Sequence, residues 1–241
     1  MSESNRSHIV LASVVVSIGI AAAGYFVGQT LYNSKVGINT AEVKGLAERR
    51  VEADRAFWRI QYTVSGQERD AIAALYEESK EHQARIVALL LETGFDETEV
   101  TRGVVDYRLV EYRDEDQKLV DEKYVLTGTI EVETNKVRLV SSARSKLNEL
   151  IALGIDIRNN SPSYYFTRLN DIKPEMLKEA TTNARIAANE FAANAGVEVG
   201  GIRDATQGGF IIRDVGEDYS DTAKIEKDVR VVTTITFYLT D

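Results

Sequence analysis

The sequence predicts an α+β fold in which an antiparallel sheet carries three helices on one face. Two patterns predict it. Several stretches alternate apolar and polar side chains with the period of two that is typical of strands burying one face. Three other stretches repeat apolar residues every three or four positions, as helices do, and each ends in a glycine followed by an apolar residue. We therefore expect the order β-α-β-β, then a helix, then β-α-β-β again.

The N-terminus differs in kind, because the run from Ile9 to Tyr32 contains no charged residue. A bilayer core needs about 20 such residues in a helix. We predict an N-terminal flank (1–8), a transmembrane signal anchor (9–32), a linker (33–41) and a folded domain (42–241). A buried core helix would show a more amphipathic pattern.

A cleavable signal peptide is the other alternative, since the three alanines before Gly24 resemble a cleavage site. The apolar run continues beyond that point, which favours an uncleaved anchor. Arg6 lies on one side of the run and Lys35 and Lys44 on the other, so charge alone does not fix the orientation.

The first part of the domain predicts two extended pieces and a helix. The first piece covers residues 42–51, and in the second Trp58, Ile60, Tyr62 and Val64 alternate with more polar residues. The helix runs from about Gln67 to Thr93. A left-handed glycine at position 94 would end it, with Phe95 packing back on the last turn.

A hairpin and a second helix follow. Val105, Tyr107 and Leu109 share one face of the first strand, and the acidic tip at 114–116 turns the chain into its partner. On that partner strand, the even-numbered residues from Tyr124 to Val132 point to the core. The second helix spans about Asn135 to Leu153 and ends at Gly154.

The third helix follows a predicted strand from Ser161 to Leu169. We expect it to begin at Pro174, because proline fits a first helical turn, where its missing N–H breaks no hydrogen bond. Gly196 ends it. Its apolar stripe is mostly alanine, which predicts close packing on a sheet: Leu177, Ala180, Ala184, Ala187, Ala188, Phe191 and Ala195.

The last strand runs from Val229 to Leu239 and turns its odd-numbered residues to one face. It carries only one charge, Arg230. If it lay at a sheet edge it would be poorly protected against pairing with another chain. The alternative is a central position, with both edges covered by the extended segment Glu42–Val51.

Composition excludes several functions. The net charge is −9 and no Lys/Arg cluster is visible, which argues against nucleic-acid binding. Cysteine is absent, so disulfides, thiol nucleophiles and cysteine-ligated metals are excluded. His8 and His82 are the only histidines, and no nucleotide-loop or serine-nucleophile motif is present. We therefore predict no catalytic, cofactor-binding or metal-binding residue, and an activity that is not enzymatic.

Four stretches carry a family resemblance: KGLAERRVEADRAFWRIQYTVSG, YYFTRLNDIKPEMLKEATTNARIAANEFA, GGIRDATQGGFIIRD and VRVVTTITFYL. Together they resemble the SIMPL-domain family of bacteria from about Val43 to Leu239. The family includes envelope proteins described as oxidative-stress defence or immunogenic outer-membrane proteins. The resemblance implies a SIMPL-type α+β fold, export to the periplasm and, for some members, ring-like homo-oligomers. It implies no active-site residue.

These observations lead to two functional hypotheses. The first is a single-pass inner-membrane protein whose periplasmic SIMPL domain self-assembles and serves envelope or oxidative-stress tolerance. The second is a periplasmic small-ligand-binding protein with a pocket between helices and sheet. A deep pocket with convergent polar groups would favour the second, and a broad self-complementary surface the first.

Overall fold

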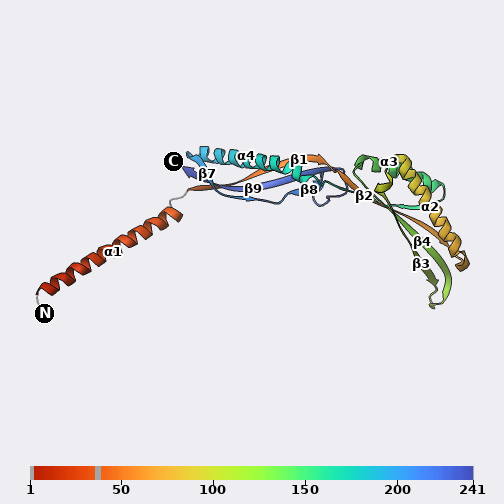
Figure 1. Cartoon of the computed structure of the whole chain (residues 1–241), viewed down its shortest axis with the longest axis horizontal. Helices are drawn as coiled ribbons and strands as arrows, with labels where there is room; N and C mark the ends of the chain where they lie inside the picture. The colour runs from red at the N-terminus through yellow and green to blue at the C-terminus, as the bar shows by residue number, and fades with distance from the viewer. Residues whose placement is uncertain (1–2, 36–38, 241) are drawn as a thin grey trace. The chain divides into compact units, whose positions relative to one another are not determined.

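The computed structural model describes residues 3–35 and 39–240 (Figure 1). It contains helices and two antiparallel sheets, which confirms the α+β class, although we had expected one sheet. The domain divides into two compact units. The first contains the chain up to Ala47, Leu177–Gly209 and the chain from Val231 onward. The second contains Glu48–Met176 and Phe210–Arg230.

The N-terminal apolar run forms a helix, α1 (Glu3–Lys35). Its segment Leu11–Tyr32 has a mean hydropathy of 2.0, and none of it is buried against protein. At 1.5 Å per residue, these 22 residues extend over about 33 Å, enough for a bilayer core. The chain therefore has one N-terminal helix that is long and apolar enough to cross a membrane.

The first sheet has the strand order β1-β9-β7, formed by β1 (Thr40–Glu52), β9 (Glu226–Thr240) and β7 (Glu198–Gln207). A short strand, β8 (Ile211–Asp214), pairs with the first residues of β9. Because β9 lies between β1 and β7, it is a central strand, and the possibility that it forms an exposed edge is wrong. Its inward alternation is confirmed from Val229 to Phe237.

Helix α4 (Leu169–Ala195) lies along one face of this sheet (Figure 1). Its close packing on the sheet through alanines is confirmed, but the stripe is shifted from the predicted one. Every fourth residue is buried: Met176, Ala180, Ala184, Ala188 and Ala192. Phe191 is 56% exposed, and Ala187 and Ala195 are exposed as well, so these three predicted stripe members are wrong. The buried row turns gradually around the helix, and Phe191 is not part of it.

The second sheet has the order β3-β4-β2-β5, and its strands are β3 (Val100–Arg113), β4 (Leu119–Thr134), β2 (Arg55–Gly66) and β5 (Asp156–Asn159). A three-residue strand, β6 (Ser163–Tyr165), also pairs with β2. The predicted single strand from Ser161 to Leu169 is therefore wrong. Only Ser163–Tyr165 pairs with β2, and Leu169 already belongs to α4.

Helices α2 (Ile72–Thr93) and α3 (Val137–Ala152) cover one face of this second sheet (Figure 1). Short 3-10 turns precede α2 and β3, at Arg69–Ala71 and Glu97–Glu99. The core between helices and sheet is built from the inward residues of β2 and β4 and from the inner faces of both helices. It includes Trp58, Ile60, Tyr62, Ile86, Leu90, Ile130, Val132, Val140 and Leu147.

The predicted glycine ends of three helices are confirmed. Gly94, Gly154 and Gly196 have φ angles of 117°, 89° and 73°, which L side chains rarely adopt. After α4, the Gly196 N–H donates to the Ala193 carbonyl at 3.3 Å, and the Val197 N–H to the Ala192 carbonyl at 3.0 Å. The same pair of hydrogen bonds closes the other two helices, which makes each end a Schellman motif.

The start of α4 differs from the prediction. Pro174 lies inside the helix, more than one turn after Leu169, so the helix does not begin at the proline. The additional turn follows a segment that a distant carboxylate holds in place. Asp54 accepts hydrogen bonds from the Thr167 N–H at 2.9 Å and from Arg168 Nε at 3.0 Å. This tertiary contact outweighs the local preference of proline for a first turn.

Candidate functional site

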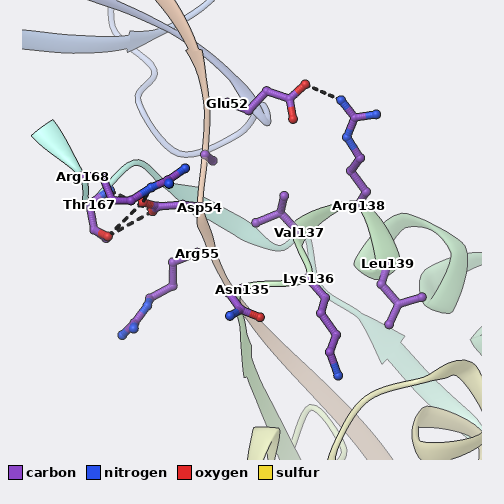
Figure 2. Close-up of a pocket in the computed structure, with 11 residues that line it drawn as sticks. Glu52, Asp54, Arg55, Asn135, Lys136, Val137, Arg138, Leu139, Thr167 and Arg168 are labelled. Carbon is purple, nitrogen blue, oxygen red and sulfur yellow. Dashed lines mark hydrogen bonds and ion pairs between the residues drawn. The ribbon is translucent and has the colours of Figure 1, made fainter. Parts of the chain in front are cut away.

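A polar hollow with six charged lining residues lies in the second unit and has a volume of about 630 Å³. Three segments form it: the β1–β2 connection, the start of α3 and the residues just before α4 (Figure 2). The charged residues among those that line it are Glu52, Asp54, Arg55, Lys136, Arg138 and Arg168. The cations outnumber the carboxylates, which makes an anionic ligand the first one to consider.

Asp54 is the most constrained of these residues. Partial burial by itself would raise the pKa of its carboxyl group. The hydrogen bonds from the Thr167 N–H and hydroxyl and from the Arg168 guanidinium outweigh that effect and hold the pKa below its usual value. Asp54 is therefore ionised at neutral pH, and its acceptor capacity is used within the protein. Its arrangement fits a structural clamp at the start of α4.

The other cations of this hollow are also paired. Arg138 forms an ion pair with Glu52, and Arg55 Nη1 lies 2.8 Å from Glu133 Oε1. Lys136 Nζ lies 2.7 Å from Asp96 Oδ2 and 3.0 Å from Glu99 Oε2, and its hydrogen bond to Asp96 is the main reason that its pKa is raised.

The directions of these side chains weigh against a common ligand. Figure 2 shows Arg138 turned toward Glu52, while Lys136 points away to the other side. A binding site needs polar groups that converge on one place. Here each cation faces its own carboxylate instead, so the hollow does not have the convergent groups that would favour a small-ligand site.

A second hollow, about 740 Å³, lies beside α3 and the loop before β9. Arg144, Tyr164, Lys224 and Glu226 are among its lining residues. Burial raises the pKa of the Tyr164 phenol, so this hydroxyl remains protonated at neutral pH. This hollow offers a phenol, two cations and one carboxylate.

Neither histidine-based nor carboxylate-based metal binding finds support in the described residues. Within 3–35 and 39–240 no group of three His, Asp or Glu side chains could hold a metal ion. His82 lies half-buried on α2 with Nε2 3.8 Å from Glu78 Oε1, and its Nδ1 has no hydrogen-bond partner. His8 lies among residues whose side chains are not described. The absence of catalytic, cofactor and metal residues stays a prediction.

The sequence reasoning missed a buried ion pair. Lys227 on β9 and Asp214 at the end of β8 are both fully buried and bind each other through Nζ and Oδ1. Burial alone would raise the pKa of Asp214, but the hydrogen bonds from Lys227, Ser220 and backbone N–H groups lower it to about 2. Lys227 also donates to the Asp221 carbonyl at 2.8 Å. The pair fixes the loop between β8 and β9.

The β3–β4 hairpin carries a group of exposed apolar side chains. Strand β2 pairs with β4 only as far as Tyr124, so β4 residues 119–123 pair with β3 alone. We call residues 104–123 the hairpin arm. Its exposed large apolar residues are Val104 (84% exposed), Tyr107, Leu109, Tyr112, Leu119 and Val120. Scattered exposed apolar residues are ordinary, but six of them on one hairpin make it a candidate contact surface.

The fold and these surfaces define a class of protein: an α+β domain of two antiparallel sheets that follows a helix long enough to span a membrane. The chain belongs to the SIMPL family. The family model described as "SIMPL: Protein of unknown function (DUF541)" matches residues 41–237, so the resemblance seen in the sequence is confirmed. A comparison with curated proteins found no match.

Proposed function

We propose that the protein is a non-enzymatic envelope protein, held in the inner membrane by α1, whose SIMPL domain self-assembles in the periplasm. In this proposal the assembly serves envelope or oxidative-stress tolerance, and nucleic acid is not a partner. The membrane attachment is supported by the apolar segment Leu11–Tyr32. The net charge of −9 supports the exclusion of nucleic acid.

The observation that carries the self-assembly is the hairpin arm, together with the open edge of β3. Only the outer part of the arm, residues 110–123, is a two-stranded ribbon, because residues 105–109 pair with a part of β4 that also pairs with β2. Such a ribbon is marginally stable by itself. A second protein surface that covers the arm would bury its exposed apolar side chains and extend the sheet. A second copy of the chain is the partner that is always present.

The alternative, a periplasmic small-ligand-binding protein, rests on the hollow beside Tyr164. It has less support, because the charged groups of the other hollow diverge and pair with one another. Native mass spectrometry of protein purified from membranes would detect a retained small molecule. A stoichiometric adduct would favour the ligand-binding alternative over self-assembly.

The proposed orientation makes a first prediction. With α1 spanning the inner membrane and the domain in the periplasm, alkaline phosphatase fused after Asp241 should be active, because that enzyme needs the oxidising periplasm. A cytoplasmic reporter at the same position should be inactive. The reverse pattern of the two reporters would show that the domain faces the cytoplasm.

The proposed assembly makes a second prediction. The full chain, purified in detergent, should have a polypeptide mass that is a multiple of 26.8 kDa by light scattering with the detergent contribution subtracted. The mass should fall toward that of one chain on dilution. A mass of one chain across the whole concentration range would remove self-assembly from the proposal.

A further inference from the structure

Strand β3 offers an open side for pairing. It forms the edge of the sheet order β3-β4-β2-β5, so within the described residues only one of its two sides is hydrogen-bonded to another strand. Its pairing with β4 is regular from Val105 to Tyr112, between one register shift at 102–105 and another at 112–113. This regular run is long enough to accept a further strand.

Symmetry limits how two copies of β3 can pair. If they join as antiparallel neighbours across a two-fold axis, that axis is perpendicular to the sheet, and both copies keep the same face up. Residues opposite each other then point to the same side. One residue therefore lies on the axis and faces its own copy, and the others oppose residues an even number of positions away.

Charge selects one of the arrangements whose axis lies at residues 107–110, the middle of this run. With Tyr107 on the axis, Asp106 faces Arg108 of the second copy twice, and Val105 faces Leu109 twice. With Arg108 on the axis, two guanidinium groups would face each other. Axes at Leu109 or Val110 place Arg108 opposite an apolar or aromatic residue and leave Asp106 without an opposite charge. Opposite charges across strands stabilise pairing and like charges oppose it.

We propose that the protein self-associates by antiparallel pairing of β3 with β3 of a second copy, with Tyr107 on the two-fold axis. This inference rests on the proposed self-assembly and names the surface that performs it. The pairing continues the sheet across both copies. Tyr107 and Leu109 are exposed in one chain. The pairing brings these residues of both copies to the same face of the continuous sheet.

The charges of β3 support this partner. Charged side chains on an edge strand usually prevent pairing with other chains. Here Asp106 and Arg108 are exposed, and neither forms an ion pair among the described residues. These two charged side chains disfavour pairing of β3 with most other strands, but they are complementary to a second β3 in this one register. The contact is small, so it should be weak in dilute solution and stronger when membrane tethering concentrates the chains.

Cysteine cross-linking of the full chain in native membranes tests the register, because the protein contains no cysteine of its own. Tyr107→Cys places two sulfhydryl groups on the axis, within the roughly 4.4–6.8 Å Cα separation that disulfides need. The matched control is Leu109→Cys on the same face of the same strand. Its two copies would be four residues apart along the strands, about 13 Å, which is too far.

We expect a disulfide-linked dimer from Tyr107→Cys after mild oxidation and at least about fivefold less from Leu109→Cys. The double variant Val105→Cys with Leu109→Cys should link as Tyr107→Cys does. Cross-linking locates the contact, whereas mass alone does not, since Gly24 and Gly28 on α1 have a spacing at which membrane helices can associate.

A charge exchange tests the chemistry in the Tyr107→Cys background. Asp106→Arg or Arg108→Asp alone places like charges opposite each other and should reduce the dimer yield by about fivefold or more. The two changes together restore opposite charges and should restore the yield. Because both residues are exposed, neither change should unfold the domain.

The outcomes separate the two proposals. Efficient linking through Leu109→Cys rather than Tyr107→Cys, or no recovery in the charge-exchange double variant, would overturn the register. An assembled mass without any cross-link on β3 would overturn this interface and leave self-assembly standing. A one-chain mass at every concentration, again without cross-links, would overturn both.

Discussion

Replacing Lys227 with methionine should lower the free energy of unfolding by about 3–5 kcal/mol, because it leaves a buried carboxylate without its cation. Methionine retains most of the apolar volume of lysine, so the change removes charge rather than packing. Asp214 would keep the hydrogen bonds from Ser220 and from the Ala223 N–H at 2.8 Å. These do not replace a positive charge in a site from which water is excluded.

Trp58 gives the readout for this variant. It is the only tryptophan, it is fully buried, and its Nε1 donates to the Asn160 carbonyl at 2.9 Å. Denaturant unfolding of the full chain in detergent can therefore be followed by its fluorescence. Lys224→Met is the matched control, because Lys224 pairs with Glu217 in a solvent-exposed bridge and its loss should change stability by less than about 1 kcal/mol. Equal stability of the two variants would contradict the prediction.

The pH dependence of the same pair distinguishes lost charge from lost packing. The pKa of Asp214 in the folded protein, about 2, lies below its ordinary value of 3.8. The stability that the ionised carboxylate contributes is therefore present above pH 3.8 and is lost as the pH falls toward 2. Without Lys227 the folded pKa rises, so the difference in stability between wild type and variant should shrink on acidification. A difference that is constant with pH would indicate a packing defect.

Local patterns in the sequence predicted much of the fold. The alternation on β2, β4 and β9 and the three glycine helix ends depend on neighbouring residues, and the structure confirms them. The features that the sequence did not predict depend on residues far apart. Asp54 determines where α4 begins, although it lies over 100 positions before it. The central place of β9 depends on β1, which lies at the other end of the domain.

The candidate sites also depend largely on residues that are far apart in the sequence. Lys227 stands at an inward position of the β9 alternation, two residues before Val229, and this was a signal for a buried lysine. Its partner could not be predicted, because Asp214 resembles any acidic residue near a turn. The diverging cations around Asp54 could not be predicted either, since they come from three separate segments. The two-stranded outer part of the arm, residues 110–123, becomes visible only once β2 is seen to end at Gly66.

Replacing Gly45 with alanine should destabilise the first unit by about 3 kcal/mol, although alanine normally favours folding over glycine by reducing the entropy of the unfolded chain. A Cβ at this position of β1 would lie 1.8 Å from the Ala180 carbonyl oxygen and 2.6 Å from the Ala184 nitrogen. Both are backbone atoms of α4, so no side-chain rotation can relieve the overlap. The helix would have to move away from the sheet.

That movement would also lengthen the hydrogen bond from Asn183 Nδ2 to the Leu46 carbonyl, now 2.7 Å, and separate Ala184 and Ala188 from Ile235 and Phe237. Gly201→Ala on β7 is the matched control, because its Cβ would meet nothing within 4 Å. Its stability should stay within about 0.5 kcal/mol of wild type. Hydrogen exchange of the α4 amides in the full chain should show faster exchange in Gly45→Ala alone. If α4 exchanged equally slowly in both variants, the close approach of α4 to β1 at Gly45 would be wrong.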